Sequence, residues 1–285
     1  MPSANITAAT VDTVPPTDRS TLRQRVISSL VLAPIPLVAA FLGRPFWDIL
    51  IAATGALMAW EWARLCCRGT ATPVGLATIA IAPLIVAVGA IWGTAIALIA
   101  LVIAIAATAA VAVFEKSGGQ SWLALGVAYV GLPCLALTSI RAMLDGGLAT
   151  LLWVLALVWA TDTGAYAAGR TIGGPKLAPR ISPNKTWAGL IGGMVAAGLV
   201  GLVAAVWLSV PSVSMVVLLS IGLAIVEQAG DLFESGVKRH FGVKDSGNLI
   251  PGHGGVLDRV DGLLAVSLAV AALSWGLQHT ILLGP

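Results

Sequence analysis

The sequence predicts an all-α, polytopic integral membrane protein with about nine transmembrane helices. Of its 285 residues, 58% are hydrophobic and only 10% are charged, and the mean hydropathy is +0.95. Soluble domains have about 45–50% apolar and about 25% charged residues. Charged side chains are absent from residues 69–114, 186–226 and 262–285. A spanning helix needs about 20 apolar residues, so these runs hold two, two and one spans.

Reading the apolar runs in order gives nine predicted helices. They cover residues 26–43, 46–65, 74–92, 94–114, 122–140, 148–168, 187–208, 213–233 and 262–283. Barrel strands are excluded because these runs are too long and too continuous. Together they form one transmembrane catalytic domain over residues 26–285, preceded by a cytoplasmic tail of residues 1–25 that we expect to be disordered.

Local features justify individual spans. The first follows Arg19, Arg23 and Arg25, and tight turns near Gly93 and Pro211 join the third to the fourth and the seventh to the eighth. Tryptophans, which favour the membrane interface, lie near the ends of four spans: Trp47, Trp92, Trp122, Trp187 and Trp207. The seventh contains the small residues Gly189, Gly192, Gly193, Ala196 and Ala197, which allow close helix contact.

The distribution of basic residues predicts the orientation. Only Arg44 and Arg141 of the 16 Lys and Arg residues fall in one set of alternate loops; the other 14 fall in the opposite set, with the N-terminal tail. Cytoplasmic loops carry the excess of Lys and Arg. We therefore expect a multi-pass protein of the cell (inner) membrane, with its N-terminus and its two polar segments, about residues 169–186 and 234–261, in the cytoplasm and its C-terminus opposite. Nothing indicates nucleic-acid binding.

Charge is concentrated between residues 227 and 261, which hold 10 of the 29 charged residues. Glu227, Asp231, Glu234 and Lys238 follow steps of four, three and four, and so lie on one face of a helix. Carboxylates at membrane depth are costly and usually functional. A solvated interfacial stripe is the alternative for Glu234 and Lys238.

A glycine-rich loop follows, and then Asp258 and Asp261, three residues apart at the start of the ninth helix. With Asp231 these carboxylates would repel one another unless a cation were bound. Oxygen ligands suit a hard ion, so we predict Mg²⁺ held by Asp231, Asp258 and Asp261. Such an ion usually bridges substrate phosphates.

The other polar segment interleaves Arg170, Lys176, Arg180 and Lys185 with Gly, Pro, Ser and Thr. Backbone amides, hydroxyls and cations of this kind bind phosphate oxygens. A positive-inside loop without a ligand is the alternative. Asp162 precedes the segment in an otherwise apolar helix, and we predict a functional role for it.

Residues 235–261, SGVKRHFGVKDSGNLIPGHGGVLDRVD, resemble the signature of the phosphatidate cytidylyltransferases, also called CDP-diacylglycerol synthases. GDLFE before it and the distant ISPNKTW resemble further segments of that family, in the same order. The resemblance implies a polytopic enzyme of phospholipid biosynthesis that converts CTP and phosphatidate to CDP-diacylglycerol and pyrophosphate with a divalent cation. This chain departs from the family pattern at Ala188, where the family has a Glu.

The resemblance also implies roles for individual positions. Asp231, Asp258 and Asp261 match the metal-binding carboxylates, and a second cation stays an alternative. The basic positions that would contact phosphates in catalysis are Lys238, Arg239, Lys244 and Arg259, beside the predicted Asp162. Substrate binding is expected at Ser182, Lys185, Thr186, His253, Gly254 and Gly255. For His253, a hydrogen bond that orders the loop is an equal alternative.

Two other functions remain as alternatives. A CTP-dependent lipid kinase could use a similar metal and basic loop, and an ion-coupled transporter could use buried acids as an ion path. A transporter favours acids spread over several mid-membrane helices, whereas here they gather in one segment and its loop. The sequence leaves the oligomeric state open, with a homodimer among the alternatives.

Overall fold

The computed structural model describes residues 33–67, 73–115, 120–250, 254–277 and 282. Over these residues the chain forms nine helices and one two-stranded sheet. The helices are α2 (Pro34–Leu42), α3 (Phe46–Cys66), α4 (Pro73–Trp92), α5 (Thr94–Glu115), α6 (Gln120–Ala142), α7 (Gly147–Thr171), α8 (Trp187–Trp207), α9 (Val213–His240) and α10 (Leu257–Leu277). The strands are β1 (Lys176–Ala178) and β2 (Ser182–Thr186).

The all-helical, multi-pass architecture confirms the sequence prediction. Eight of the described helices, α3 to α10, are long and apolar enough to cross a membrane. The first predicted span appears as the nine-residue α2, and its beginning, residues 26–32, lies outside the described residues, as does the predicted tail of residues 1–25. His253 also lies outside them.

The structure departs from the prediction most clearly at two helix ends and in one polar segment. Helix α9 continues to His240 and α10 begins at Leu257, because charged residues extend both helices beyond the apolar window that located them. The segment predicted as an irregular polar loop contains the β1–β2 hairpin, with Lys176 paired to Thr186 and Ala178 to Ser182. Its end is fixed by Trp187, whose N–H donates to the Pro175 carbonyl oxygen at 3.1 Å.

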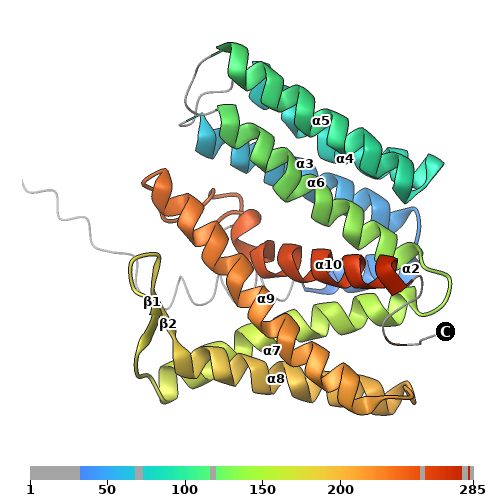
Figure 1. The fold of residues 1–285 in the computed structure, drawn as a ribbon, viewed down its shortest axis with the longest axis vertical. Helices are drawn as coiled ribbons and strands as arrows, with labels where there is room; N and C mark the ends of the chain where they lie inside the picture. Colours follow the sequence, from blue (N-terminus) through green and yellow to red (C-terminus); the bar gives the residue numbers. More distant parts are fainter. Residues whose placement is uncertain (1–32, 68–72, 116–119, 251–253, 278–281, 283–285) are drawn as a thin grey trace, which may run out of the picture.

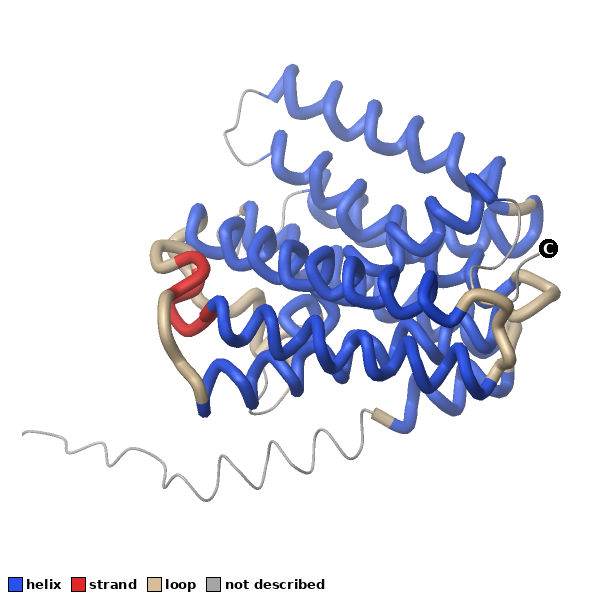
Figure 2. The backbone as a smooth tube through the Cα atoms, turned by 60° about the horizontal axis from the view of Figure 1, so that its bottom comes forward, coloured by secondary structure: helices blue, strands red, loops and turns tan. Residues whose placement is uncertain are grey.

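The helices form two groups joined by α10 (Figure 1). Helices α3 to α6 pack together in one group, and α7, α8 and α9 in the other, while α10 contacts α6, α7 and α9. The tube in Figure 2 shows the helices running roughly side by side, with the hairpin at one end of the bundle. The hairpin, the end of α9 and the start of α10 therefore lie at the same end of the molecule.

Small residues bring α7 and α8 into close contact. A Cβ atom on Gly192 would collide with the Cβ of Ala168 and would lie 2.8 Å from the Gly164 carbonyl oxygen. A Cβ on Gly193 would lie 3.0 Å from the Thr161 methyl group. This seam confirms the predicted use of small residues for helix contact, and it places α7, which carries Asp162, beside the hairpin.

We expect Gly192→Ala to destabilise the protein by about 1–3 kcal/mol, because the added methyl group overpacks the α7–α8 seam. Gly222→Ala is the matched control, since a Cβ at Gly222 on α9 meets nothing within 4 Å and alanine has the higher helix propensity. Thermal unfolding in detergent measures both. Equal midpoints for the two variants would contradict the close-contact interpretation.

Candidate active site

One face of α9 carries the polar residues of the candidate site. Glu227, Gln228 and Glu234 are 1%, 5% and 1% exposed, and Asp231 and Lys238 are partly buried between them. The helical spacing predicted from the sequence is confirmed, because α9 is continuous from Val213 to His240. These side chains are held away from solvent by α10 and by the β1–β2 hairpin.

Lys185 of β2 connects the hairpin to this face. Its Nζ lies 2.6 Å from Asp231 Oδ2 and donates to Gln228 Oε1 at 2.8 Å. Gln228 in turn donates from Nε2 to Glu227 Oε2 at 2.8 Å, and Ser235 donates to Asp231 Oδ1 at 3.3 Å. A single lysine thus fixes the hairpin against two side chains of α9.

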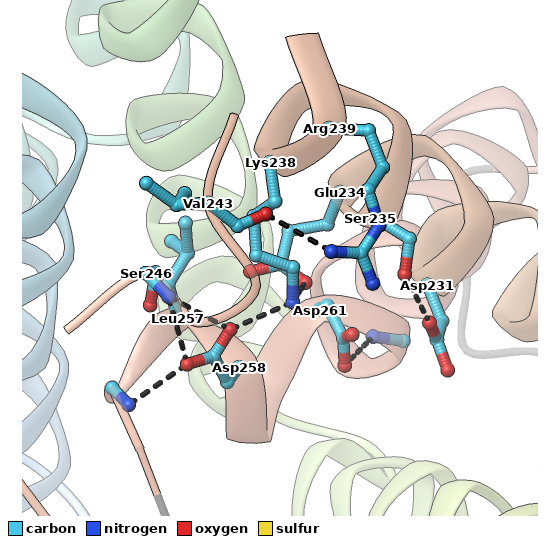
Figure 3. Close-up of polar contacts among 12 residues, drawn as sticks. Asp231, Glu234, Ser235, Lys238, Arg239, Val243, Ser246, Leu257, Asp258 and Asp261 are labelled. Carbon is cyan, nitrogen blue, oxygen red and sulfur yellow. Dashed lines mark hydrogen bonds and ion pairs between the residues drawn. The ribbon is translucent and has the colours of Figure 1, made fainter. Parts of the chain in front are cut away.

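Lys238 lies between two carboxylates from different helices (Figure 3). Its Nζ is 2.7 Å from Glu234 Oε2 and 2.7 Å from Asp258 Oδ1. The three side chains are 12%, 1% and 5% exposed, so the contacts are shielded from water. An ammonium group has three donors, which leaves Lys238 able to contact one further acceptor.

Asp258 also fixes the loop before α10. Its carboxylate accepts from the Ser246 N–H at 3.0 Å and from the Gly255 N–H at 2.8 Å. Gly254 adopts φ +86°, a left-handed conformation that favours glycine, and its carbonyl oxygen accepts from the Ile250 N–H at 2.9 Å. The chain therefore folds back tightly just before the helix that carries Asp258 and Asp261.

Asp261 extends from the first turns of α10 toward the side of α9 that carries Asp231, and Figure 3 shows it between Asp231 and Asp258. One of its oxygens accepts the Gly262 N–H at 2.8 Å. Asp162 of α7 lies within electrostatic range of Asp231 and Glu227. The site is thus built from α7, β2, α9 and α10.

The three predicted metal ligands do not converge on one point. Among the described residues, no group of three or more His, Cys, Asp and Glu side chains is arranged to hold a metal ion. Asp261 lies within electrostatic range of Asp231, whose oxygens are contacted by Lys185 and Ser235. The Asp258 oxygens accept from Lys238 and two backbone amides. Mg²⁺ is usually bound by one or two carboxylates together with substrate phosphates, and Asp231 and Asp261 fit that donor set.

The remaining basic residues surround this region. Arg239 is exposed and donates to the carbonyl oxygens of Ile181, in the hairpin turn, and Val243. Lys244 is exposed on the loop after α9, and Arg259 is exposed on the first turn of α10 within electrostatic range of Asp162. Basic residues of three segments therefore lie at this end of the bundle.

Several predicted substrate-binding residues have structural contacts. Thr186 is 4% exposed and caps α8, because its Oγ1 accepts the Gly189 N–H at 3.0 Å. Ser182 begins β2 and is partly buried, and Ala188 lies in the first turn of α8. Gly255 is buried against the side chain of Ser246. Among the predicted basic residues of the two polar segments, Lys185 and Lys238 form ion pairs with the carboxylates.

Sequence reasoning missed two members of the site. Gln228 joins Lys185 to Glu227. In the sequence, its position next to the row of charged residues on α9 could have indicated that it belongs to the site. Glu61 of α3 is fully buried and accepts from three donors of the loop before α10. In the sequence, Glu61 is an isolated acidic residue between Trp60 and Trp62. That position does not indicate which residues it contacts.

This arrangement can bring anions together. Carboxylates, which can bind a hard cation, lie beside lysines and arginines, which can contact phosphate oxygens, at the end of a membrane-embedded bundle. Among the described residues, we find no Ser, Cys or Thr nucleophile paired with a histidine. The chemistry that fits is transfer between phosphates by positioning and charge neutralisation.

Comparison with known proteins identifies the family. The profile described as "Cytidylyltransferase family" matches residues 23–276. The phosphatidate cytidylyltransferase of Brucella suis is 42% identical over 251 residues, which cover 87% of this chain and 91% of the relative. That of Pseudomonas aeruginosa is 40% identical, covering 89% and 97%, and that of Staphylococcus haemolyticus is 46% identical over 50% of this chain and 54% of the relative. The chain therefore belongs to the phosphatidate cytidylyltransferase family.

Proposed function

We propose that this protein catalyses the reaction of CTP with phosphatidate to give CDP-diacylglycerol and pyrophosphate. The observation that carries the proposal is the meeting of Lys185, Asp231, Lys238 and Asp261 at one end of a membrane-spanning bundle. The family membership and the 40–42% identity over most of the chain support the same reaction.

The reaction needs no catalytic base. A phosphomonoester loses its second proton near pH 6, so phosphatidate is largely a dianion at neutral pH. Its oxygen forms the new bond to the α-phosphorus of CTP as the bond to the pyrophosphate oxygen breaks. The site must align these atoms and suppress the repulsion between two anions.

We assign a divalent cation, Mg²⁺, to Asp231 and Asp261. A cation held by these residues would supply neutralisation of phosphate charge and orientation of the two substrates. Asp258 stays a prediction as a third ligand. Both Asp231, contacted by Lys185 and Ser235, and Asp258 would exchange a present contact to bind the cation. A second cation stays an alternative. Asp162 and Glu227 are candidates for it, because two adjacent carboxyls repel each other unless a proton or cation lies between them.

The basic residues bind phosphate oxygens in this proposal. Lys238 uses its third donor, and Lys185 contacts phosphate from the hairpin while Gln228 and Asp231 orient it. Arg239, Lys244 and Arg259 supply charge at the entrance, where CTP arrives from the cytoplasm. Phosphatidate reaches the same region laterally from the bilayer, since the carboxylates lie at the ends of membrane-spanning helices.

The orientation of the protein belongs to the same proposal. The hairpin, the end of α9 and the start of α10 lie at one end of the bundle (Figure 1), and the loops of that end hold most of the basic residues. Arg141, by contrast, contacts the Ala40 carbonyl oxygen at the opposite end. We therefore place the site in the cytoplasm.

Purified protein supplied with phosphatidate, Mg²⁺ and labelled CTP tests the reaction. Label at the α-phosphorus should enter the lipid fraction, and label at the γ-phosphorus should appear in pyrophosphate. Chelation of the divalent cation should stop both. Lipid labelled only from the γ-position would instead establish the lipid kinase, and ion transport by vesicles without CTP turnover would establish the transporter.

A further inference from the structure

The loop before α10 lacks a local N-terminal cap. The helix begins at Leu257, and the residues just before it are Gly254, Gly255 and Val256. None of these has a side-chain oxygen to accept the first amides of the helix, and unpaired amides there are costly when buried. The acceptor must come from elsewhere in the chain.

Glu61 of α3 supplies that acceptor. Its Oε1 accepts the Val256 N–H at 2.9 Å and its Oε2 accepts the Leu257 N–H at 2.8 Å. Oε2 also accepts the Ser246 hydroxyl at 3.2 Å. The carboxylate is 0% exposed, so these donors replace its hydration, and its charge lies at the positive end of the α10 dipole.

The loop is shaped around this carboxylate. A Cβ atom on Gly247 would lie 2.7 Å from Glu61 Oε1, and one on Gly255 would lie 2.7 Å from both oxygens. A side chain at either position would therefore displace the Glu61 carboxylate, and at Gly255 it would also displace the Ser246 hydroxyl group. Together, Glu61 and Asp258 bind the amides of Ser246, Gly255, Val256 and Leu257.

We propose that Glu61 is a positioning residue for the active-site loop: it caps α10 from α3 and thereby fixes where Asp258 and Asp261 lie relative to Lys238 and Asp231. The expected effect of Glu61 on the reaction rate rests on the proposed cytidylyltransferase function. The cap itself does not rest on that function. The half of the chain that contributes no phosphate-binding group thus sets the geometry of the site.

Hydrogen exchange of the full-length protein in detergent tests the cap directly. In the wild type, the Val256 and Leu257 amides should exchange slowly, although first-turn amides of an uncapped helix exchange fast. Glu61→Gln keeps one carbonyl acceptor and should raise their exchange about tenfold, and Glu61→Leu should raise it further. Fast exchange of both amides in the wild type would overturn the proposal.

The kinetic test separates positioning from general destabilisation. Glu61→Gln should lower kcat/KM for cytidylyl transfer about 10- to 100-fold, the usual effect of removing a supporting hydrogen-bond partner. Asp48→Asn, at the other end of α3 and paired with Arg44, is the control and should change neither that rate nor the exchange of Val256. Increased exchange throughout the molecule in Glu61→Gln, matched by the control, would refute a positioning role.

The outcomes distinguish this inference from the function on which it builds. Wild-type protein with protected amides but no cytidylyl transfer would leave the cap established and the function wrong. Full activity in Glu61→Gln with Val256 and Leu257 exchanging faster would show that the cap does not position the site.

Discussion

Replacing Asp261 by asparagine is expected to abolish cytidylyl transfer, a loss of at least about 10²-fold, while the protein remains folded. Asparagine preserves the shape of the side chain and can still accept the Gly262 N–H, but it removes one of the two negative charges assigned to the cation. The measurement is initial velocity as a function of Mg²⁺ concentration, with thermal unfolding as the test of folding.

Asp145→Asn is the matched control for this variant. Asp145 is an exposed carboxylate between α6 and α7, at the opposite end of the bundle, so its neutralisation should leave the velocity unchanged. Activity near that of the wild type in Asp261→Asn would refute the metal assignment. An equal loss of initial velocity in both variants would show that removing any negative charge lowers the activity, whether or not the residue binds the cation.

Lys238→Met is expected to reduce both stability and activity, and by large amounts. The substitution leaves Glu234 and Asp258 without their shared cation, and their side chains are 1% and 5% exposed. Removing one partner of a buried ion pair costs about 3–5 kcal/mol. Thermal unfolding measures the first effect and CTP turnover the second.

A double variant separates the two effects. Lys238→Met combined with Glu234→Gln removes the uncompensated charge of Glu234 and should recover part of the stability. Activity should not recover, because the phosphate contact proposed for Lys238 remains absent. Recovery of both together would make Lys238 a structural residue alone and would remove it from the proposed mechanism.

The helices could be predicted because crossing a membrane imposes a strong constraint on sequence. Apolar runs of about 20 residues, five of them in charge-free stretches, located the spans from α3 to α10. The spacing of Asp231, Glu234 and Lys238 correctly predicted one face of a helix. The boundaries of α9 and α10 were wrong by several residues, because charged residues continue a helix once it leaves the apolar layer.

What the sequence could not supply was pairing between distant segments. The contact of Lys185 with Asp231 depends on how the hairpin folds over α9, and no local pattern encodes that. Asp258 and Asp261 were predicted to bind a metal together because they are three residues apart. In the structure, the Asp258 oxygens accept hydrogen bonds from Lys238 and from backbone amides. The role of Glu61 could not be predicted for the same reason, because its hydrogen-bond partners lie almost two hundred residues away in the chain.

The contact between Glu61 and the start of α10 has a consequence for biosynthesis. The two segments are 195 residues apart in the chain, and a ribosome adds about 5–20 residues per second. Glu61 is therefore made roughly 10–40 s before the amides that it binds. Throughout that interval the nascent protein lacks its last helix, so the enzyme becomes competent only when the final segment has entered the membrane.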